Sequence, residues 1–148
     1  MTDVKVTPGE AGDILQFGPT RIRILEDGSG TENRSSAIAS TMAPHTEGPK
    51  PHVHLMHDEA FLVTSGVLRF LLGDVQRDAK AGEHVVVPVG APHTFVNASD
   101  EPVNFFTTFT PAFYINSFRE LATLNAEGGW NAQTEAEVLM RCATVLCD

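Results

Sequence analysis

Three histidines and two acidic residues stand within the eight residues HVHLMHDE, residues 52–59. His52 and His54 are two positions apart, and side chains on a β-strand alternate between faces, so both imidazoles would project from the same face. A tight turn at residues 57–58 would let the next strand begin at Glu59 and bring its carboxylate toward the same point. Imidazole and carboxylate groups together predict one half of a transition-metal site.

The second half of the site is expected from His93, which follows the turn sequence PVGAP and begins another strand. Taken alone, the pair His52 and His54 is as readily explained by two structural histidines as by ligands. The predicted set of His52, His54, Glu59 and His93 suits one divalent Fe, Mn, Co, Ni or Zn ion better than Ca or Mg. Four protein ligands would leave one or two metal positions open for substrate or water.

The other polar residues near these positions are given structural interpretations. His57 is expected to be solvated in the turn, with Asp58 as a turn residue. Asn97 is expected to form structural hydrogen bonds. His45 and His84 have no partner that the sequence identifies.

The first 110 residues contain many short apolar segments that alternate with Gly, Pro and Asp every eight to twelve residues. This spacing is typical of an all-β sandwich or barrel. The segment 26–34 is expected to be a turn, 43–51 a loop, and Arg77 and Lys80 part of a turn. The expected strands lie within residues 13–18, 20–27, 35–42, 52–56, 59–66, 67–74, 84–90, 93–100 and 103–110.

The periodicity changes after residue 110 and predicts two helices, which would pack outside the barrel or cover one end. Thr110 as N-cap and Pro111 as first residue would begin the first helix, and residues 127–130 would end it. Thr134 and Glu137 are expected to form a capping box for the second helix. The two apolar stripes consist of Tyr114, Phe118 and Leu121, and of Leu139, Cys142 and Leu146.

Two spaced motifs in this sequence resemble those of the cupin family. The first motif is matched by His52, His54, Glu59 and Gly66, and the second by Gly82, Pro88, Gly90, His93 and Asn97. The glycine that the family pattern places six residues before His52 is Thr46 here, with Gly48 nearby.

The resemblance implies a single-domain, antiparallel jelly-roll barrel with the metal inside. Residues 1–34 would supply N-terminal strands and a turn, 35–110 the barrel core, and 111–148 the helices, all in one domain. The segment TPAFYINSFRELATL also resembles the tail of small cupins similar to quercetin dioxygenase.

A positive metal site beside aromatic rings predicts a flat, apolar, enolic or phenolic substrate, with Glu59 as general base. The resemblance favours a dioxygenase. A non-redox isomerase, cyclase or decarboxylase would use the same ligands, and a non-catalytic binding cupin is a third alternative. The rings are equally explained by simple barrel packing. The expected pocket residues are Phe61, Phe70, Phe95, Phe105 and Phe109.

The net charge of −9 argues against a nucleic-acid or anionic-membrane partner. The sequence has no run of 18 apolar residues and no apolar leader, so a cytoplasmic protein is expected. The two cysteines, Cys142 and Cys147, are expected to be reduced thiols, with Cys142 packing as a small apolar residue. By analogy with small cupins, the N-terminal strands would form a homodimer.

Overall fold

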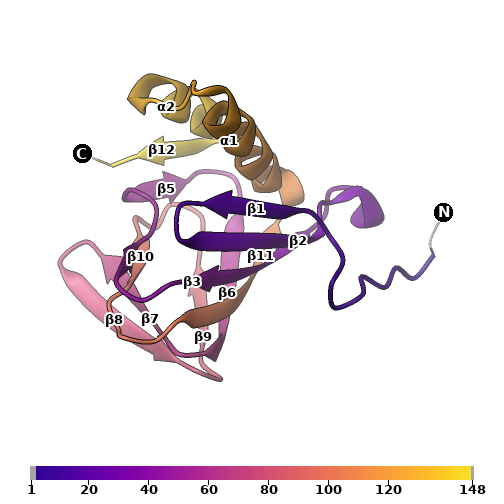
Figure 1. Ribbon diagram of the computed structural model, residues 1–148. Helices are drawn as coiled ribbons and strands as arrows, with labels where there is room; N and C mark the ends of the chain where they lie inside the picture. The colour runs from indigo at the N-terminus through magenta and orange to yellow at the C-terminus, as the bar shows by residue number, and fades with distance from the viewer. Residues whose placement is uncertain (1–2, 148) are drawn as a thin grey trace.

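The computed structural model describes residues 3–147, so residues 1–2 and 148 of the expected terminal parts lie outside it. Antiparallel sheets wrap around a common interior, and two helices lie across one end of the barrel (Figure 1). The predicted all-β jelly roll with two C-terminal helices is therefore confirmed. None of the described helices is long and apolar enough to cross a membrane.

Three sheets make up the β-structure. The six-stranded sheet has the order β1 (Ile14–Phe17), β2 (Thr20–Glu26), β3 (Ser36–Met42), β11 (Val103–Thr110), β6 (Asp58–Ser65) and β9 (His84–Val87). The four-stranded sheet has the order β4 (Thr46–Glu47), β10 (Thr94–Asn97), β7 (Val67–Leu72) and β8 (Val75–Lys80). The two-stranded sheet pairs β12 (Thr144–Leu146) with β5 (His52–His54).

Strict alternation in the central strands determines which side chains enter the barrel. In β6, Glu59, Phe61 and Val63 are buried, whereas Leu62 between them is exposed. In β11, the buried side chains are again every second residue from Val103. Because side chains along a strand alternate between faces, a buried carboxylate and buried rings share the interior.

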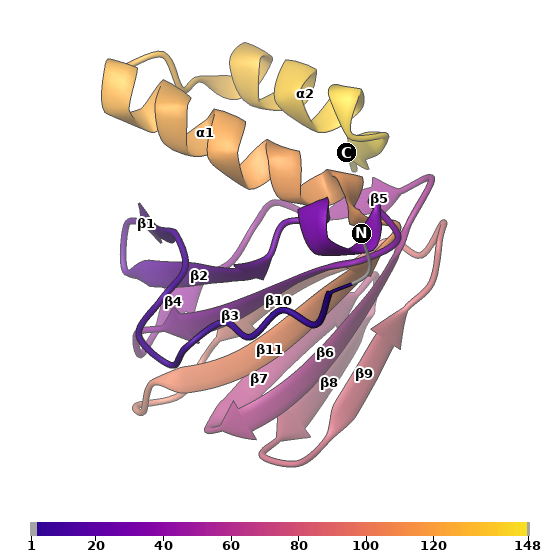
Figure 2. The same ribbon diagram turned by 90° about the vertical axis from the view of Figure 1, so that its right-hand side faces the viewer.

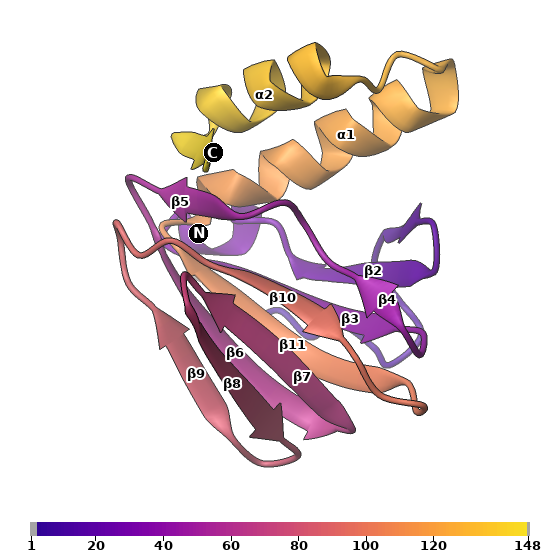
Figure 3. The same cartoon turned by 90° about the vertical axis from the view of Figure 1, so that its left-hand side faces the viewer.

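The helices cover the end of the barrel at which β5 and β12 lie (Figures 2 and 3). Helix α1 (Ile115–Glu127) and helix α2 (Ala132–Arg141) follow a 3₁₀ turn, η2 (Ala112–Tyr114), and a second short turn, η1 (Ser29–Thr31), precedes β3. Tyr114, Ile115 and Leu139 pack with barrel residues such as Ile38 and Phe109 in one apolar cluster. The helices therefore form a cap that is continuous with the core.

Both helices begin at other residues than the sequence predicts. Thr110 ends β11 and Pro111 precedes η2, so α1 begins only at Ile115 and has no side-chain cap. In α2, the capping box is formed by Asn131 and Thr134, in place of the expected Thr134 and Glu137. The Asn131 side chain accepts hydrogen bonds from two backbone amides, and asparagine is as strong an N-cap as serine.

The chain beyond α2 departs most from the prediction. The second helix ends at Arg141, and Ala143 takes a left-handed conformation with φ of 52°. The next three residues form β12, so Leu146 lies on a strand and not in the predicted helical stripe. Cys142 and Leu146 are still partly buried and pack against the apolar cluster that contains Tyr114 and Leu139. Both cysteines are free thiols.

Arg77 and Lys80 also differ from the expectation, because they belong to β8 and not to a turn. The strand lies at the edge of the four-stranded sheet, and of its six residues Ala79 alone is buried. A solvated edge strand needs no apolar alternation, which explains why the sequence pattern missed it. The turn before it consists of Gly73 and Asp74.

Candidate metal centre

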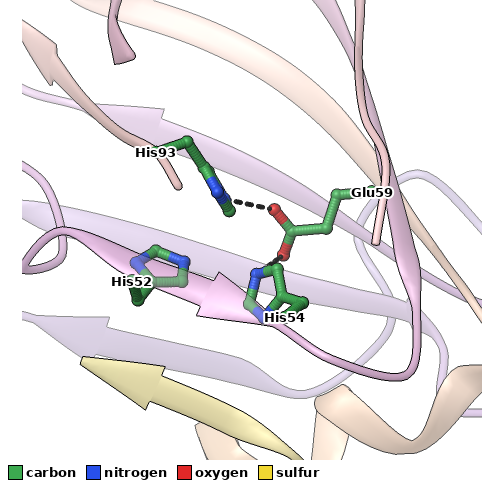
Figure 4. Close-up of side chains that lie close together, drawn as sticks. All are labelled: His52, His54, Glu59 and His93. Atoms are coloured by element: carbon green, nitrogen blue, oxygen red, sulfur yellow. Dashed lines mark hydrogen bonds and ion pairs between the residues drawn. The ribbon is translucent and has the colours of Figure 1, made fainter. Parts of the chain in front are cut away.

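Four side chains converge inside the barrel, close to the cap. Each of His52, His54, Glu59 and His93 offers a ligand atom, and these atoms lie within 4.8 Å of one another. All four residues are buried, with at most 4 % of their surface exposed. Figure 4 shows the three imidazoles arranged around the carboxylate.

Backbone pairing brings these residues together from three parts of the chain. His52 and His93 form an isolated antiparallel bridge, with reciprocal amide-to-carbonyl hydrogen bonds of 3.0 Å. Glu59 pairs with Phe109 on one side and Val87 on the other. The strand periodicity that predicted His52 and His54 on one face agrees with the structure, because both are buried and Val53 between them is only partly buried.

The outward nitrogen of each histidine is held by an acceptor. Nδ1 of His52 donates to the carbonyl oxygen of Lys50 at 2.7 Å, and Nδ1 of His93 donates to that of Ala91 at 3.0 Å. Nδ1 of His54 lies 2.8 Å from the hydroxyl oxygen of Thr144. With the proton on Nδ1, each Nε2 presents a lone pair to the interior, as metal ligation requires.

The inner contacts fit a cation. Nε2 of His54 lies 3.0 Å from Oε1 of Glu59, and Nε2 of His93 lies 3.1 Å from Oε2. Although Nε2 of His54 lies close to Oε1 of Glu59, it has no hydrogen-bond partner of suitable geometry among the described residues. Buried lone pairs that face a buried carboxylate are unfavourable alone, whereas a divalent cation would satisfy them all.

The electrostatics keep the cluster in the protonation state that binds a metal. Burial, together with the nearby His93, lowers the pKa of His52 to about 4. Burial also lowers the pKa of His54. Burial would raise the pKa of Glu59, but its contacts with the three histidines His54, His57 and His93 outweigh burial and hold that pKa well below its ordinary value. At neutral pH, His52 and His54 are therefore neutral imidazoles, and Glu59 is an ionised carboxylate.

The low pKa of His52 predicts that the metal-free protein loses stability in acid. Unfolded His52 takes up a proton below pH 6.5, but the folded form does so only near pH 4, so protons favour unfolding between these values. The depressed pKa of Glu59 acts in the same direction. Urea unfolding at pH 7 and pH 4 should show a loss on the order of 3 kcal/mol from His52. A His52→Asn variant that shows the same loss would contradict this assignment.

His57 contradicts its prediction as a solvated turn residue. It is 4 % exposed, and its ring packs against those of His54 and Tyr114, at centroid distances of 4.0 and 4.8 Å. Its Nε2 is 3.8 Å from Oε1 of Glu59, beyond hydrogen-bonding distance. The turn would be open in the barrel alone, but Tyr114 at the start of the cap covers it, and the local sequence carries no signal of that contact.

The remaining polar residues lie away from the cluster. Asp58 begins β6 and accepts a hydrogen bond from the amide of Val89 at 2.9 Å, so it is a strand residue and not a turn residue. Asn97 donates to three backbone carbonyls, as its predicted structural role requires. His45 is exposed beside Asp100, and His84 is exposed at the start of β9.

A cavity of about 350 Å³ lies between the barrel and the cap, next to the cluster. His52 and Glu59 contribute to its wall, and apolar side chains of both layers form most of the rest. From the C-terminal segment, these are Tyr114, Phe118, Leu121, Trp130, Leu139 and Leu146. The cavity could hold a small ligand of roughly drug-like volume.

Four of the five expected pocket residues line this cavity: Phe61, Phe95, Phe105 and Phe109. Phe70 is not among the residues that line it. It is 1 % exposed and packs edge-on against Phe61 at 5.1 Å, within the closed part of the barrel core. Alternation places Phe70 inward but cannot tell a filled layer from an open one.

Three residues of the cavity wall, Trp130, Glu135 and Lys50, are joined by polar contacts. Nε1 of Trp130 donates to Oε2 of Glu135 at 2.6 Å, and Oε1 of the same carboxylate lies 3.6 Å from Nζ of Lys50. The Trp130 ring also meets Phe17 of β1 edge-on at 5.8 Å. These residues, which the sequence did not single out, join the cap to the loop before His52.

The glycine that the cupin pattern places at position 46 is found two residues later, at Gly48. A Cβ at Gly48 would overlap the backbone carbonyl oxygen of Phe95, so the loop requires glycine here, whereas Thr46 is buried and fits β4. Gly48→Ala should destabilise the protein by about 1–3 kcal/mol, because the loop must move away from β10. Thermal unfolding would measure this loss. Gly73→Ala is the comparison variant, because Gly73 has φ of 68° and open space around it, so alanine there meets backbone strain without steric overlap.

Residues 39–109 match the cupin domain family. No curated protein matches the sequence. The structure is similar to KdgF from Halomonas sp., at 18 % identity and a TM-score of 0.64, covering 74 % of this chain and 94 % of that one.

Two further solved structures share the fold. An RmlC-like cupin from Shewanella frigidimarina is 23 % identical, with a TM-score of 0.61, over 76 % of this chain and 96 % of that one. The polyketide cyclase RemF from Streptomyces resistomycificus is 23 % identical, with a TM-score of 0.56, over 74 % and 75 %. The matched region contains all four converging side chains, and residues 39–109 of this chain form a cupin domain.

Proposed function

We propose that this protein is a metal-dependent cupin enzyme that acts on an enolic or phenolic aromatic molecule, with a dioxygenase reaction as the first candidate. The observation that carries the proposal is a buried cluster of three histidines and one glutamate at the wall of an aromatic cavity. A divalent transition metal held by His52, His54, Glu59 and His93 would stabilise an enolate or phenolate oxygen as a Lewis acid and, if redox-active, support oxygen chemistry.

Residues of the chain would bind the substrate, exclude water and accept its proton. The Phe61, Phe95 and Phe105 rings form an apolar wall that favours a flat ring system and excludes water. Glu59 faces the same cavity as an ionised carboxylate, so it can accept the proton of the enol or phenol on Oε1 or Oε2. The cap residues Tyr114 and Leu139 would enclose the substrate from the opposite side.

A non-redox cyclase, isomerase or decarboxylase is the second candidate. The fold similarity to the polyketide cyclase RemF, whose substrate class also suits an aromatic cavity, favours this alternative. Both candidates use the same ligands and the same base. Oxygen consumption during turnover separates them, because the non-redox reactions consume no O₂.

The first experiment is a screen of flavonols and aromatic polyketides against protein reconstituted with Fe, Mn, Co, Ni or Zn. Trp130 is the sole tryptophan of the sequence and lines the cavity, so its fluorescence reports binding independently of turnover. Product formation with O₂ uptake would support the dioxygenase, and product without uptake the cyclase or isomerase. Tight binding without product under any of the metals would contradict an enzyme and support a binding protein.

A further inference from the structure

The three histidines of the metal cluster differ in what holds their outward nitrogen. His52 and His93 each donate to a backbone carbonyl two residues earlier, at Lys50 and Ala91. A side-chain substitution leaves such acceptors in place. His54 alone uses a side chain, the hydroxyl of Thr144, at 2.8 Å.

Thr144 belongs to the C-terminal strand, outside the residues 39–109 that match the cupin domain family. Its hydroxyl lies 3.3 Å from the carbonyl oxygen of Cys142 and donates its proton there. The same oxygen then accepts from Nδ1–H of His54, which leaves Nε2 of His54 deprotonated toward the cluster. Because Thr144 is fully buried, no water competes for this hydrogen bond.

The pairing of β12 with β5 fixes Thr144 opposite His54. The register aligns Thr144 with His54, and two backbone hydrogen bonds flank it, from Leu55 to Ala143 and from Cys147 to Pro51, both 2.8 Å. A slip of one residue would place alanine or valine opposite His54, and neither has a hydroxyl. The short strand therefore delivers one hydroxyl to one ligand.

We propose that Thr144 is a positioning residue of the metal centre, which holds the ring orientation and the Nδ1–H tautomer of His54 from the C-terminal segment. The inference rests on the proposed metal site and adds a residue from outside the cupin domain. Partners of ligating histidines typically change metal affinity by about 10–100-fold when removed. The C-terminal segment is thus part of the metal site as well as a cover for the cavity.

The test compares Thr144→Val, which keeps the branched shape but loses the hydroxyl, with Thr144→Ser, which keeps the hydroxyl. Cobalt(II) affinity, measured by competition with a chromophoric chelator, should fall about 10–100-fold in the valine variant and recover in the serine variant. The visible cobalt spectrum should shift in the valine variant alone. Thr46→Val, which removes a partly buried hydroxyl hydrogen bond elsewhere, should leave cobalt affinity unchanged.

The outcomes distinguish this inference from the proposed function. Wild-type protein that binds no cobalt overturns both. Wild-type protein that binds cobalt, with an equal affinity in Thr144→Val, overturns the positioning role alone. If the valine variant does not fold, nitrogen NMR of the metal-free wild-type protein decides: a proton on Nδ1 of His54 supports the role, and a proton on Nε2 overturns it.

Discussion

Replacing Glu59 with glutamine should lower metal affinity by more than about 10-fold and lower turnover of an enol or phenol by about 10²–10⁴-fold even at saturating metal. Glu59 supplies the only negative charge among the four converging side chains. Glutamine has nearly the same shape but is a weak ligand and cannot accept the substrate proton. Metal titration followed by turnover at full occupancy would separate the two losses.

The matched control for this prediction is Glu101→Gln, which neutralises an exposed carboxylate away from the cluster. It should leave metal affinity and turnover unchanged. The metal-free Glu59→Gln protein should remain folded, because the amide replaces a carboxylate of equal size. A Glu59→Gln variant with wild-type turnover at full metal occupancy would refute the role of Glu59 as base.

Replacing Phe70 with alanine should destabilise the protein by about 3–5 kcal/mol, although Phe70 itself does not line the cavity. Phe70 is 1 % exposed, and its ring lies 5.1 Å from that of Phe61 and 6.0 Å from that of Phe95. The substitution removes these contacts and leaves a void in a closed part of the core. Urea unfolding of the metal-free protein would measure the loss.

The control for the core prediction is Phe113→Ala, because Phe113 is 53 % exposed. It should change the free energy of unfolding by no more than about 0.5 kcal/mol. Phe70→Leu should cost markedly less than Phe70→Ala, since leucine refills most of the space. A Phe70→Ala loss below 1 kcal/mol would contradict the closed packing of this layer and would suggest that the cavity extends to Phe70.

The sequence predicts most reliably where a site depends on periodicity and on short spacing. His52 and His54 lie two apart on a strand, and Glu59 and Phe61 share the inward face of β6, so alternation alone is enough to place them. The regular succession of short strands and turns predicts an all-β sandwich or barrel, and the resemblance to cupins selects the barrel. These features depend on neighbours in the chain.

Features that depend on distant segments were missed or misassigned. His57 is buried because Tyr114 covers it, and Thr144 contacts His54 because a three-residue strand returns after Ala143. A strand this short has too few residues to show a period, and its sequence continues the helical pattern of α2. Phe70 faces inward as expected, but whether a layer is filled depends on all the strands together.

The most direct test of the metal centre is the metal content of protein purified without an affinity tag or chelator, measured by mass spectrometry beside His52→Ala. We expect close to one Fe, Mn, Co, Ni or Zn ion per chain in the wild-type protein and its loss in the variant. Wild-type protein that holds no metal, and takes up none of these ions when they are added, would contradict it.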